Sequence, residues 1–326
     1  MSFIGYHASH EQFSPADLLR WAQHAEDAGF GGVLCSDHFA PWSETQGESG
    51  FAWSWLGAAM QATSLPFGTV NAPGDRYHPA IVAQAIATLN VMFPGRFWVA
   101  LGSGEAINEH ITGNPWPLKS VRNARLKECA EVIRALLAGE TVTHDGLVTV
   151  HNARIWSCPE TMPTIFGAAL SEETARVLGT WADGMITVQG PPDSLRRMIA
   201  AFREVAGDDA PVYVQSHISW AATDEEAREN AFDQWKTNVI AGDLGADLSS
   251  VAHFAAATAH VRPNDLDAAI RISADLGQHR AWIEQDLALG VQGIFLHNVG
   301  RNQAQFIETF GEHILPDFRG HIESSH

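Results

Sequence analysis

The stretch Phe97-Trp98-Val99-Ala100-Leu101-Gly102-Ser103-Gly104-Glu105-Ala106-Ile107-Asn108-Glu109 decides the fold. Its first five residues are apolar, which is typical of a parallel strand that is buried on both faces. Two glycines, a carboxylate and an asparagine follow at once. Glycines let a flat ligand approach the backbone, and Glu105 is a charged group that can face a pocket. The stretch therefore predicts a strand that ends in a functional loop, and the alternative is an ordinary turn.

A second such boundary occurs earlier, in Cys35-Ser36-Asp37-His38-Phe39. Eight apolar runs along the chain have the character of strands, at residues 3–9, 32–39, 65–71, 97–102, 164–168, 184–188, 211–220 and 291–297. Helical patterns separate them, at 15–29, 52–63, 79–93, 121–138, 171–181, 192–206 and 278–289. Eight alternating strands and helices predict a closed (β/α)8 barrel, whose chemistry lies on the loops after the strands. The alternative is a doubly wound open sheet, but no G-x-G-x-x-G loop follows the first strand.

The domain prediction is one barrel over residues 1–326, since a chain with 45% hydrophobic residues can bury a core of that size. Two segments interrupt the alternation. Residues 140–162 contain Asp145-Gly146, a hairpin signal, and residues 240–265 read as a lid-like insertion.

The charge excludes two classes of partner. With 38 acidic and 20 basic residues the formal net charge is −18, so nucleic acid and anionic membrane surfaces are disfavoured. The three cysteines are widely spaced, no apolar run reaches the roughly 20 residues of a membrane span, and no signal peptide is evident. We expect a cytoplasmic protein that acts on a small molecule.

Polar side chains follow the predicted strands, where a barrel brings its loops to one mouth. They are Glu11, Asp37, His38, Asn71, Glu105, Asn108, Ser171, Gln189, His297 and Asn298. Histidine exchanges protons near neutral pH, so His38 is a candidate to take a hydroxyl proton while a hydride leaves the same carbon. Glu11 or Glu105 would orient the imidazole or act as its partner acid. The structural alternative is a histidine that only completes the packing.

Other chemistries find little support. His7 and His10 do not have metal-ligand spacing, and H-x-H, H-E-x-x-H and G-x-S-x-G are absent, so we predict no metal and no nucleophilic triad. Ser171-Glu172-Glu173-Thr174 opens a helix, where Ser171 is an expected N-cap. The free N–H groups of that helix end could also hold a cofactor phosphate, although the two glutamates would oppose an anion.

Several motifs occur together: His7-Ala8-Ser9-His10-Glu11-Gln12-Phe13, Ser36-Asp37-His38-Phe39 with Pro41-Trp42, Arg76-Tyr77 with Pro79, Ala83-Gln84-Ala85, and residues 102–109. In combination they resemble the luciferase-like flavin superfamily, over nearly the whole chain. Within it, the chain resembles the branch of deazaflavin (coenzyme F420)-dependent glucose-6-phosphate dehydrogenases. The resemblance implies a (β/α)8 barrel, a homodimer and a flavin-type cofactor at the C-terminal ends of the strands.

The resemblance also implies residue roles. His38 is expected to be the acid/base that faces the substrate carbon, surrounded by Trp42, Glu105 and Glu11. The resemblance implies cofactor contacts at Asp37 and Asn108. The further predicted cofactor contacts, at the neighbouring strand ends, are Asn71, Ala72, Gly104, Ala168, Ala169 and Ser171.

The chain departs from that branch at three places. Of three basic residues that hold the sugar phosphate, one falls in Gln189-Gly190-Pro191, one in residues 254–257, and only Arg271 matches. Two lost charge-assisted contacts, each worth roughly 1.5–3 kcal/mol, argue against glucose 6-phosphate as substrate. Residues 68–76 are one residue short, and Ala168-Ala169-Leu170 replaces a double glycine at the cofactor phosphate. These last two changes resemble an offshoot that uses FMN, so FMN is the predicted cofactor and F420 the alternative.

The leading hypothesis is a flavin-dependent oxidoreductase that transfers a hydride between a small alcohol or sugar-like substrate and the cofactor. The alternatives are an FMN-dependent monooxygenase that activates oxygen, an F420-dependent dehydrogenase and a non-catalytic flavin-binding protein. The last is disfavoured because Glu11, His38 and Glu105 are all present, and a carrier does not need titratable groups in its pocket. A metal-dependent barrel hydrolase ranks last.

Overall fold

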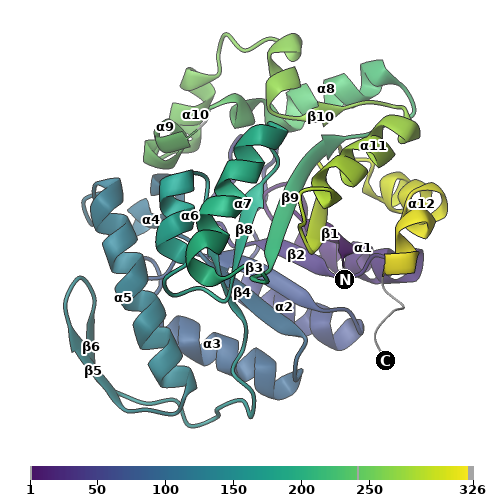
Figure 1. Ribbon diagram of the computed structural model, residues 1–326. Helices are drawn as coiled ribbons and strands as arrows, with labels where there is room; N and C mark the ends of the chain where they lie inside the picture. Colours follow the sequence, from purple (N-terminus) through teal and green to yellow (C-terminus); the bar gives the residue numbers. More distant parts are fainter. Residues whose placement is uncertain (1, 241, 322–326) are drawn as a thin grey trace.

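Eight parallel strands close into a barrel in this computed structural model, which describes residues 2–240 and 242–321 (Figure 1). Around the ring they are β1 (Phe3–Ala8), β2 (Val33–Ser36), β3 (Phe67–Asn71), β4 (Phe97–Leu101), β7 (Ile165–Ala168), β8 (Gly184–Val188), β9 (Val212–Ser219) and β11 (Gly293–Asn298). The pairings of β9 with both β8 and β11 close the ring. The predicted (β/α)8 barrel is therefore confirmed, and the open sheet is excluded.

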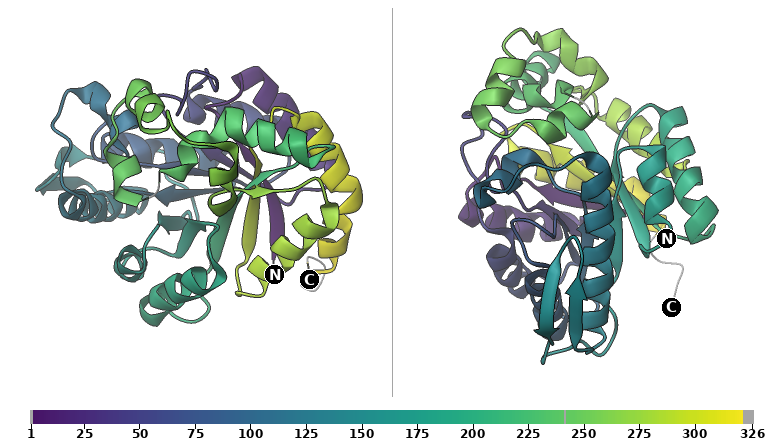
Figure 2. Two further views of the ribbon diagram at one scale, coloured as in Figure 1. Left: turned by 90° about the horizontal axis from the view of Figure 1, so that it is seen from above. Right: turned by 90° about the vertical axis from the view of Figure 1, so that its left-hand side faces the viewer.

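Helices cover the outside of this ring (Figure 2). They are α1 (Pro15–Ala28), α2 (Ala52–Ala62), α3 (Pro79–Met92), α5 (Lys119–Leu137), α6 (Glu172–Leu178), α7 (Pro192–Ala206), α8 (Asp224–Trp235), α11 (Leu276–Leu287) and α12 (Gln303–His313). Helix α1 shows why they form where they do. Ser14 caps its first turn by accepting from the N–H of Asp17, and Gly29 ends it in the left-handed region at φ 93°. Among the described residues, no helix is both long and apolar enough to cross a membrane.

Aromatic side chains fill the lower part of the barrel. One cluster draws members from all eight strands, so it lies inside the ring; Trp98, Phe166 and Phe295 belong to it. Strand glycines make room for these rings, because a Cβ at Gly68 would stand 2.1 Å from the indole of Trp98. The barrel is thus a packed core that is closed at its N-terminal end.

Histidines form the next layer toward the C-terminal ends of the strands. Side chains alternate along a strand, so the residues two positions beyond Gly5, Gln215 and Phe295 face the same interior. These residues are His7, His217 and His297, all buried. The ring centroids of His7 and His297 are 4.5 Å apart, and those of His217 and His297 are 5.4 Å apart. A polar layer therefore lies between the aromatic plug and the mouth.

Short elements occupy the loops. The hairpin β5 (Val142–Asp145) and β6 (Thr149–Ala153) projects to one side, while α9 (Gly242–Asp247) and α10 (Val251–Ala257) lie at the other end of the molecule (Figure 1). The remaining elements are α4 (Ala106–Glu109), β10 (Arg271–Ile272) and the 3-10 turns η1 (His110–Thr112), η2 (Lys236–Val239), η3 (Pro263–Ala268) and η4 (Leu315–His321). Asp247 of α9 accepts from the indole N–H of Trp116 at 2.9 Å and pairs with Arg122 at 3.3 Å, which joins α9 to the start of α5.

The sequence patterns did not predict β10 or α12. Strand β10 is only two residues long and pairs with the end of β9, so no period could show it. Helix α12 packs its buried residues against α1 and ends the last β/α unit.

Candidate active site

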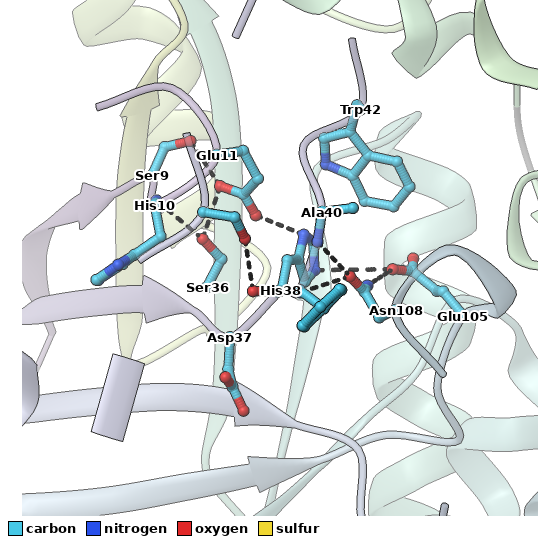
Figure 3. Close-up of polar contacts among 12 residues, drawn as sticks. Ser9, His10, Glu11, Ser36, Asp37, His38, Ala40, Trp42, Glu105 and Asn108 are labelled. Carbon is cyan, nitrogen blue, oxygen red and sulfur yellow. Dashed lines mark hydrogen bonds and ion pairs between the residues drawn. The ribbon is translucent and has the colours of Figure 1, made fainter. Parts of the chain in front are cut away.

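A buried carboxylate and an imidazole form the centre of the site. Glu11 follows β1 and His38 follows β2, and the parallel pairing of these strands brings the two loops together. Nδ1 of His38 lies 2.5 Å from Oε1 of Glu11 (Figure 3). The side chain of Glu11 is only 2% exposed, whereas that of His38 is 21% exposed. His38 is therefore the member of the pair that a bound molecule can reach.

Two serine hydroxyls hold the other oxygen of Glu11. Ser9 donates to Oε2 at 2.8 Å, and Ser36 donates to the same atom at 2.7 Å. Ser36 in turn accepts from the backbone N–H of His10 at 3.2 Å. Both carboxylate oxygens of Glu11 thus have partners despite the burial.

A second carboxylate faces the other nitrogen of His38. Oε2 of Glu105 lies 3.7 Å from Nε2 (Figure 3). Asn108, one turn further along α4, donates to that same oxygen at 3.3 Å and accepts from the backbone N–H of Phe39 at 2.8 Å. Asn108 therefore joins the loop after β4 to the loop that carries His38.

Trp42 forms an aromatic wall beside the imidazole. Its ring meets His38 edge to face, with centroids 5.0 Å apart, and meets Phe254 of α10 at 5.1 Å. Gln46 is buried and holds this loop by accepting from the backbone N–H of Trp42 at 2.8 Å. The wall is apolar and belongs partly to the lid-like segment that the sequence predicted.

The charges of the three central groups depend on one another. Burial by itself lowers the pKa of His38, but the negative charge of Glu11, with a smaller contribution from Glu105, raises it to about 9. Burial opposes ionisation of Glu11, yet His38 and the hydroxyl of Ser36 hold its pKa well below the ordinary value. For Glu105, burial raises the pKa against the attraction of His38, and the charge of Glu11 raises it further. Glu11 and His38 are therefore an ion pair at neutral pH.

Asp37 points away from this centre (Figure 3). Asn71 donates to its Oδ2 at 2.7 Å and Tyr77 donates to its Oδ1 at 3.1 Å, while Arg76 donates to its backbone carbonyl at 2.7 Å. The carboxylate of Asp37 thus orders the loops after β2 and β3. The predicted contacts of Asp37 and Asn71 with a cofactor remain predictions.

Small residues line the neighbouring strand ends. A Cβ added at Gly104, whose φ is +84°, would lie 3.4 Å from the Cβ of Ala72 and 3.3 Å from the side chain of Glu109. A Cβ at Gly102 would lie 3.6 Å from that of Ala168. The ends of β3, β4 and β7 therefore present backbone and methyl groups, which suits the approach of a flat ring system. This composition fits a flavin-type cofactor.

The predicted phosphate end of the site has an ordinary local structure. Ala169 is buried and donates its N–H to the carbonyl of Ile186. Ser171 caps α6 by accepting from the N–H of Thr174 at 3.3 Å, as predicted. Contact of these residues with a cofactor phosphate stays a prediction.

Arg271 lies away from the mouth. It pairs with Asp286 of α11 through contacts of 2.5 and 2.8 Å and donates to Ser216. Ser216 alternates with the inward-facing Gln215 and His217, so this cluster is on the outer side of the barrel wall. Gln189 is also engaged, since it accepts from the N–H of His217 at 2.8 Å. The structure thus gives the predicted substrate residue Arg271 an internal carboxylate partner.

Two contributors to the site were missed by the sequence reasoning, Ser9 and Ser36. Each is close in sequence to a residue that was singled out, Glu11 in one case and His38 in the other. The sequence does place a serine two positions before each of these titratable residues. That spacing indicates a contact with Glu11 only once the fold brings the ends of β1 and β2 together.

Known proteins resemble this chain along its length. The model of the family "Luciferase-like monooxygenase" matches residues 1–309. F420-dependent glucose-6-phosphate dehydrogenases of Beutenbergia cavernae and Microbacterium testaceum are 34% and 33% identical, and each comparison covers 97% of this chain and 97% of the relative. A solved F420-dependent secondary alcohol dehydrogenase, in complex with an F420-acetone adduct, has 30% identity and a TM-score of 0.90. That match covers 96% of this chain and 98% of the other.

Proposed function

The chain belongs to the luciferase-like monooxygenase family, and from that premise we propose that it transfers a hydride between a small secondary alcohol and a flavin-type cofactor. The observation that carries the proposal is the His38 imidazole, which is paired through Nδ1 with buried Glu11 and accessible on its other side. This arrangement is suited to moving one proton at Nε2. The fully aligned dehydrogenase of secondary alcohols supports the substrate class.

In the oxidation of an alcohol, neutral His38 accepts the hydroxyl proton at Nε2. Glu11 stabilises the imidazolium that forms, because its charge lies against Nδ1. Trp42 and Phe254 exclude water from the carbon that reacts. A bound flavin or deazaflavin ring would supply the hydride acceptor, so that the alcohol would lose its hydroxyl proton to His38 and a hydride from carbon to the cofactor, and would become a ketone. Ala72, Gly104 and Ala168 would hold the ring.

The cofactor we propose is coenzyme F420. The relatives at 30–34% identity are named as F420-dependent, which supports this choice. FMN, favoured by the short loop 68–76 and by residues 168–170, is the alternative and would admit a monooxygenase reaction.

Titration of the purified protein with F420 and with FMN, followed by absorbance, is expected to give at least about tenfold tighter binding of F420, a difference of about 1.4 kcal/mol. Oxidation of propan-2-ol with the bound cofactor then tests the reaction itself. Tighter binding of FMN would instead support the alternative cofactor. Full cofactor occupancy without turnover of any alcohol or ketone would identify a binding protein.

Glucose 6-phosphate is not expected to be a substrate, because none of the three described positions expected to hold its phosphate offers a free cation. Gln189 is engaged with the backbone of His217, and Arg271 is paired with Asp286. Steady-state assays should show no turnover above background, and the double variant Gly190→Lys/Ala256→Lys should raise phosphosugar binding while oxidation of a neutral alcohol persists. Ready oxidation of glucose 6-phosphate by the unmodified protein contradicts this expectation.

A homodimer also belongs to the proposal. Helices α2 and α3 contain no charged residue, and α3 exposes Ile81, Val91 and Met92. Two copies that each carry a net charge of −18 repel one another, so an uncharged face is the most favourable surface for their contact.

A further inference from the structure

The hydrogen bonds from Ser9 and Ser36 to Glu11 have a fixed donor and acceptor assignment. The oxygen of Ser36 accepts from the N–H of His10, so its only hydrogen is left for Oε2 of Glu11. Ser9 adds a second hydroxyl to the same oxygen. Glu11, Ser9 and Ser36 are all buried, so water does not replace these donors.

We propose that Ser9 and Ser36 are positioning residues that keep Glu11 ionised and thereby fix the proton of His38 on Nδ1. The inference rests on the proposed function in one respect, namely that His38 is the acid/base. Ser9 and Ser36 touch neither substrate nor cofactor in this scheme, and they act through Glu11.

The reason is the hydrogen-bonding inventory of a carboxyl group. An ionised Glu11 can only accept, so it requires the proton to be on Nδ1 and leaves Nε2 as the free base in neutral His38. A protonated Glu11 would donate to Nδ1, and neutral His38 would then carry its proton on Nε2, where it could not accept a hydroxyl proton. Donated hydrogen bonds favour the ionised carboxylate in a buried place. The serines thus select the tautomer that alcohol oxidation needs.

Other titratable groups surround the pair. His38 is also influenced by Glu105 and Arg76, and Glu11 lies near the histidines His7, His10, His217 and His297. The negative charge of Asp37 raises the pKa of His10, against the larger effect of burial. Burial lowers the pKa of His7 to about 3 and those of His10 and His217 to about 4, and that of His297 falls well below its ordinary value. These four rings are therefore neutral at pH 7 and do not replace the serines as charged partners of Glu11.

Nitrogen-15 NMR of the imidazoles, in the protein without added cofactor, tests the inference directly. The double variant Ser9→Ala/Ser36→Ala should raise the pH at which His38 becomes the Nε2 free base, by up to about one unit for each hydroxyl removed, because that form requires ionised Glu11. It should also move His38 toward the Nε2–H tautomer, as the proton shared with Glu11 shifts to the carboxyl group. Ser36→Thr keeps the hydroxyl and should restore the wild-type titration. Ser219→Ala is the matched control, because it removes a buried strand hydroxyl that donates to the carbonyl of Ala227 instead.

The variant Glu11→Gln shows whether the serines act on His38 through the Glu11 carboxylate or by another route. If the serines act through the carboxylate, adding Ser9→Ala/Ser36→Ala to Glu11→Gln leaves the titration of His38 unchanged. A further shift in that background, or an unchanged titration and tautomer in the otherwise wild-type protein, overturns the proposal. The single variants Ser9→Ala and Ser36→Ala provide the same test, at half the shift, if the double variant does not fold.

The activity of the protein is a separate readout. Inactivity of the wild type toward alcohols and ketones with either cofactor would refute the proposed function and leave the NMR result standing. If the enzyme is active, the double variant should move the pH profile of alcohol oxidation to higher pH by the shift seen in the NMR titration.

Discussion

The variant His38→Ala is expected to lower the turnover of a secondary alcohol by about 10²–10⁴-fold, the usual contribution of a positioned acid/base group. Hydride departure from the C–OH carbon develops positive charge there, and transfer of the hydroxyl proton to His38 relieves it. Cofactor affinity should be nearly unchanged, since the small residues proposed to hold the ring lie at the C-terminal ends of β3, β4 and β7 and not on the loop that carries His38. Steady-state kinetics together with a cofactor titration measure both effects.

The pH profile is the control for this variant. The charge of Glu11 raises the pKa of His38 to about 9, so in wild type the kcat/KM of alcohol oxidation should fall as pH drops below that value. That limb should be absent from His38→Ala. Glu105→Gln should also reduce the rate, because it alters the carboxylate that faces Nε2 at 3.7 Å. Full activity of His38→Ala with the wild-type profile would mean that Glu11 or Glu105 takes the proton.

Acid is expected to destabilise the folded protein steeply between pH 6.5 and about 4. Burial lowers the pKa of His7 to about 3 and those of His217 and His10 to about 4, against an ordinary value of 6.5. The unfolded chain binds these protons first as the pH falls, so each histidine reduces the free energy of unfolding by up to about 1.4 kcal/mol per pH unit. His38 does not contribute to this slope. Its pKa is raised, so its stabilisation is already complete below pH 6.5.

Urea denaturation at a series of pH values measures this slope. His217→Gln removes one of the buried imidazoles and should reduce the slope by about 1.4 kcal/mol per pH unit. His151→Gln is the matched control and should leave it unchanged, because His151 is exposed. An identical slope in His217→Gln and wild type would show that His217 is not held neutral in the fold.

The convergence of the central residues was predictable because the barrel imposes it. Parallel strands end at one mouth, so residues at or just after the ends of the apolar runs at 3–9, 32–39 and 97–102 must meet there. Glu11, His38 and Glu105 do so: Nδ1 of His38 lies 2.5 Å from Glu11, and Nε2 lies 3.7 Å from Glu105. No alignment of these loops was needed, only the order of strands around the ring.

The hydrogen-bond and ion-pair partners of individual side chains could not be predicted from the sequence. The sequence alone suggests that Arg271 is a free cation. In the structure it pairs with Asp286, 15 positions further along the chain, on the outer side of the barrel. Ser9 and Ser36 fall within predicted strands and were not singled out, yet both hydroxyls donate to one oxygen of Glu11. Such contacts depend on which strand neighbours which and on how side chains alternate within each strand.

The sequence by itself determined the barrel, the approximate positions of its eight strands, and the convergence of Glu11, His38 and Glu105, because a doubly buried strand must be apolar and a barrel loop can be polar. Only the tertiary structure decided which of those groups are charged, which are neutral and which are already paired. The layer of His7, His217 and His297 illustrates the reason. The three come from positions far apart in the chain, and it is their common burial inside the ring, a property of the assembled fold, that lowers their pKa values.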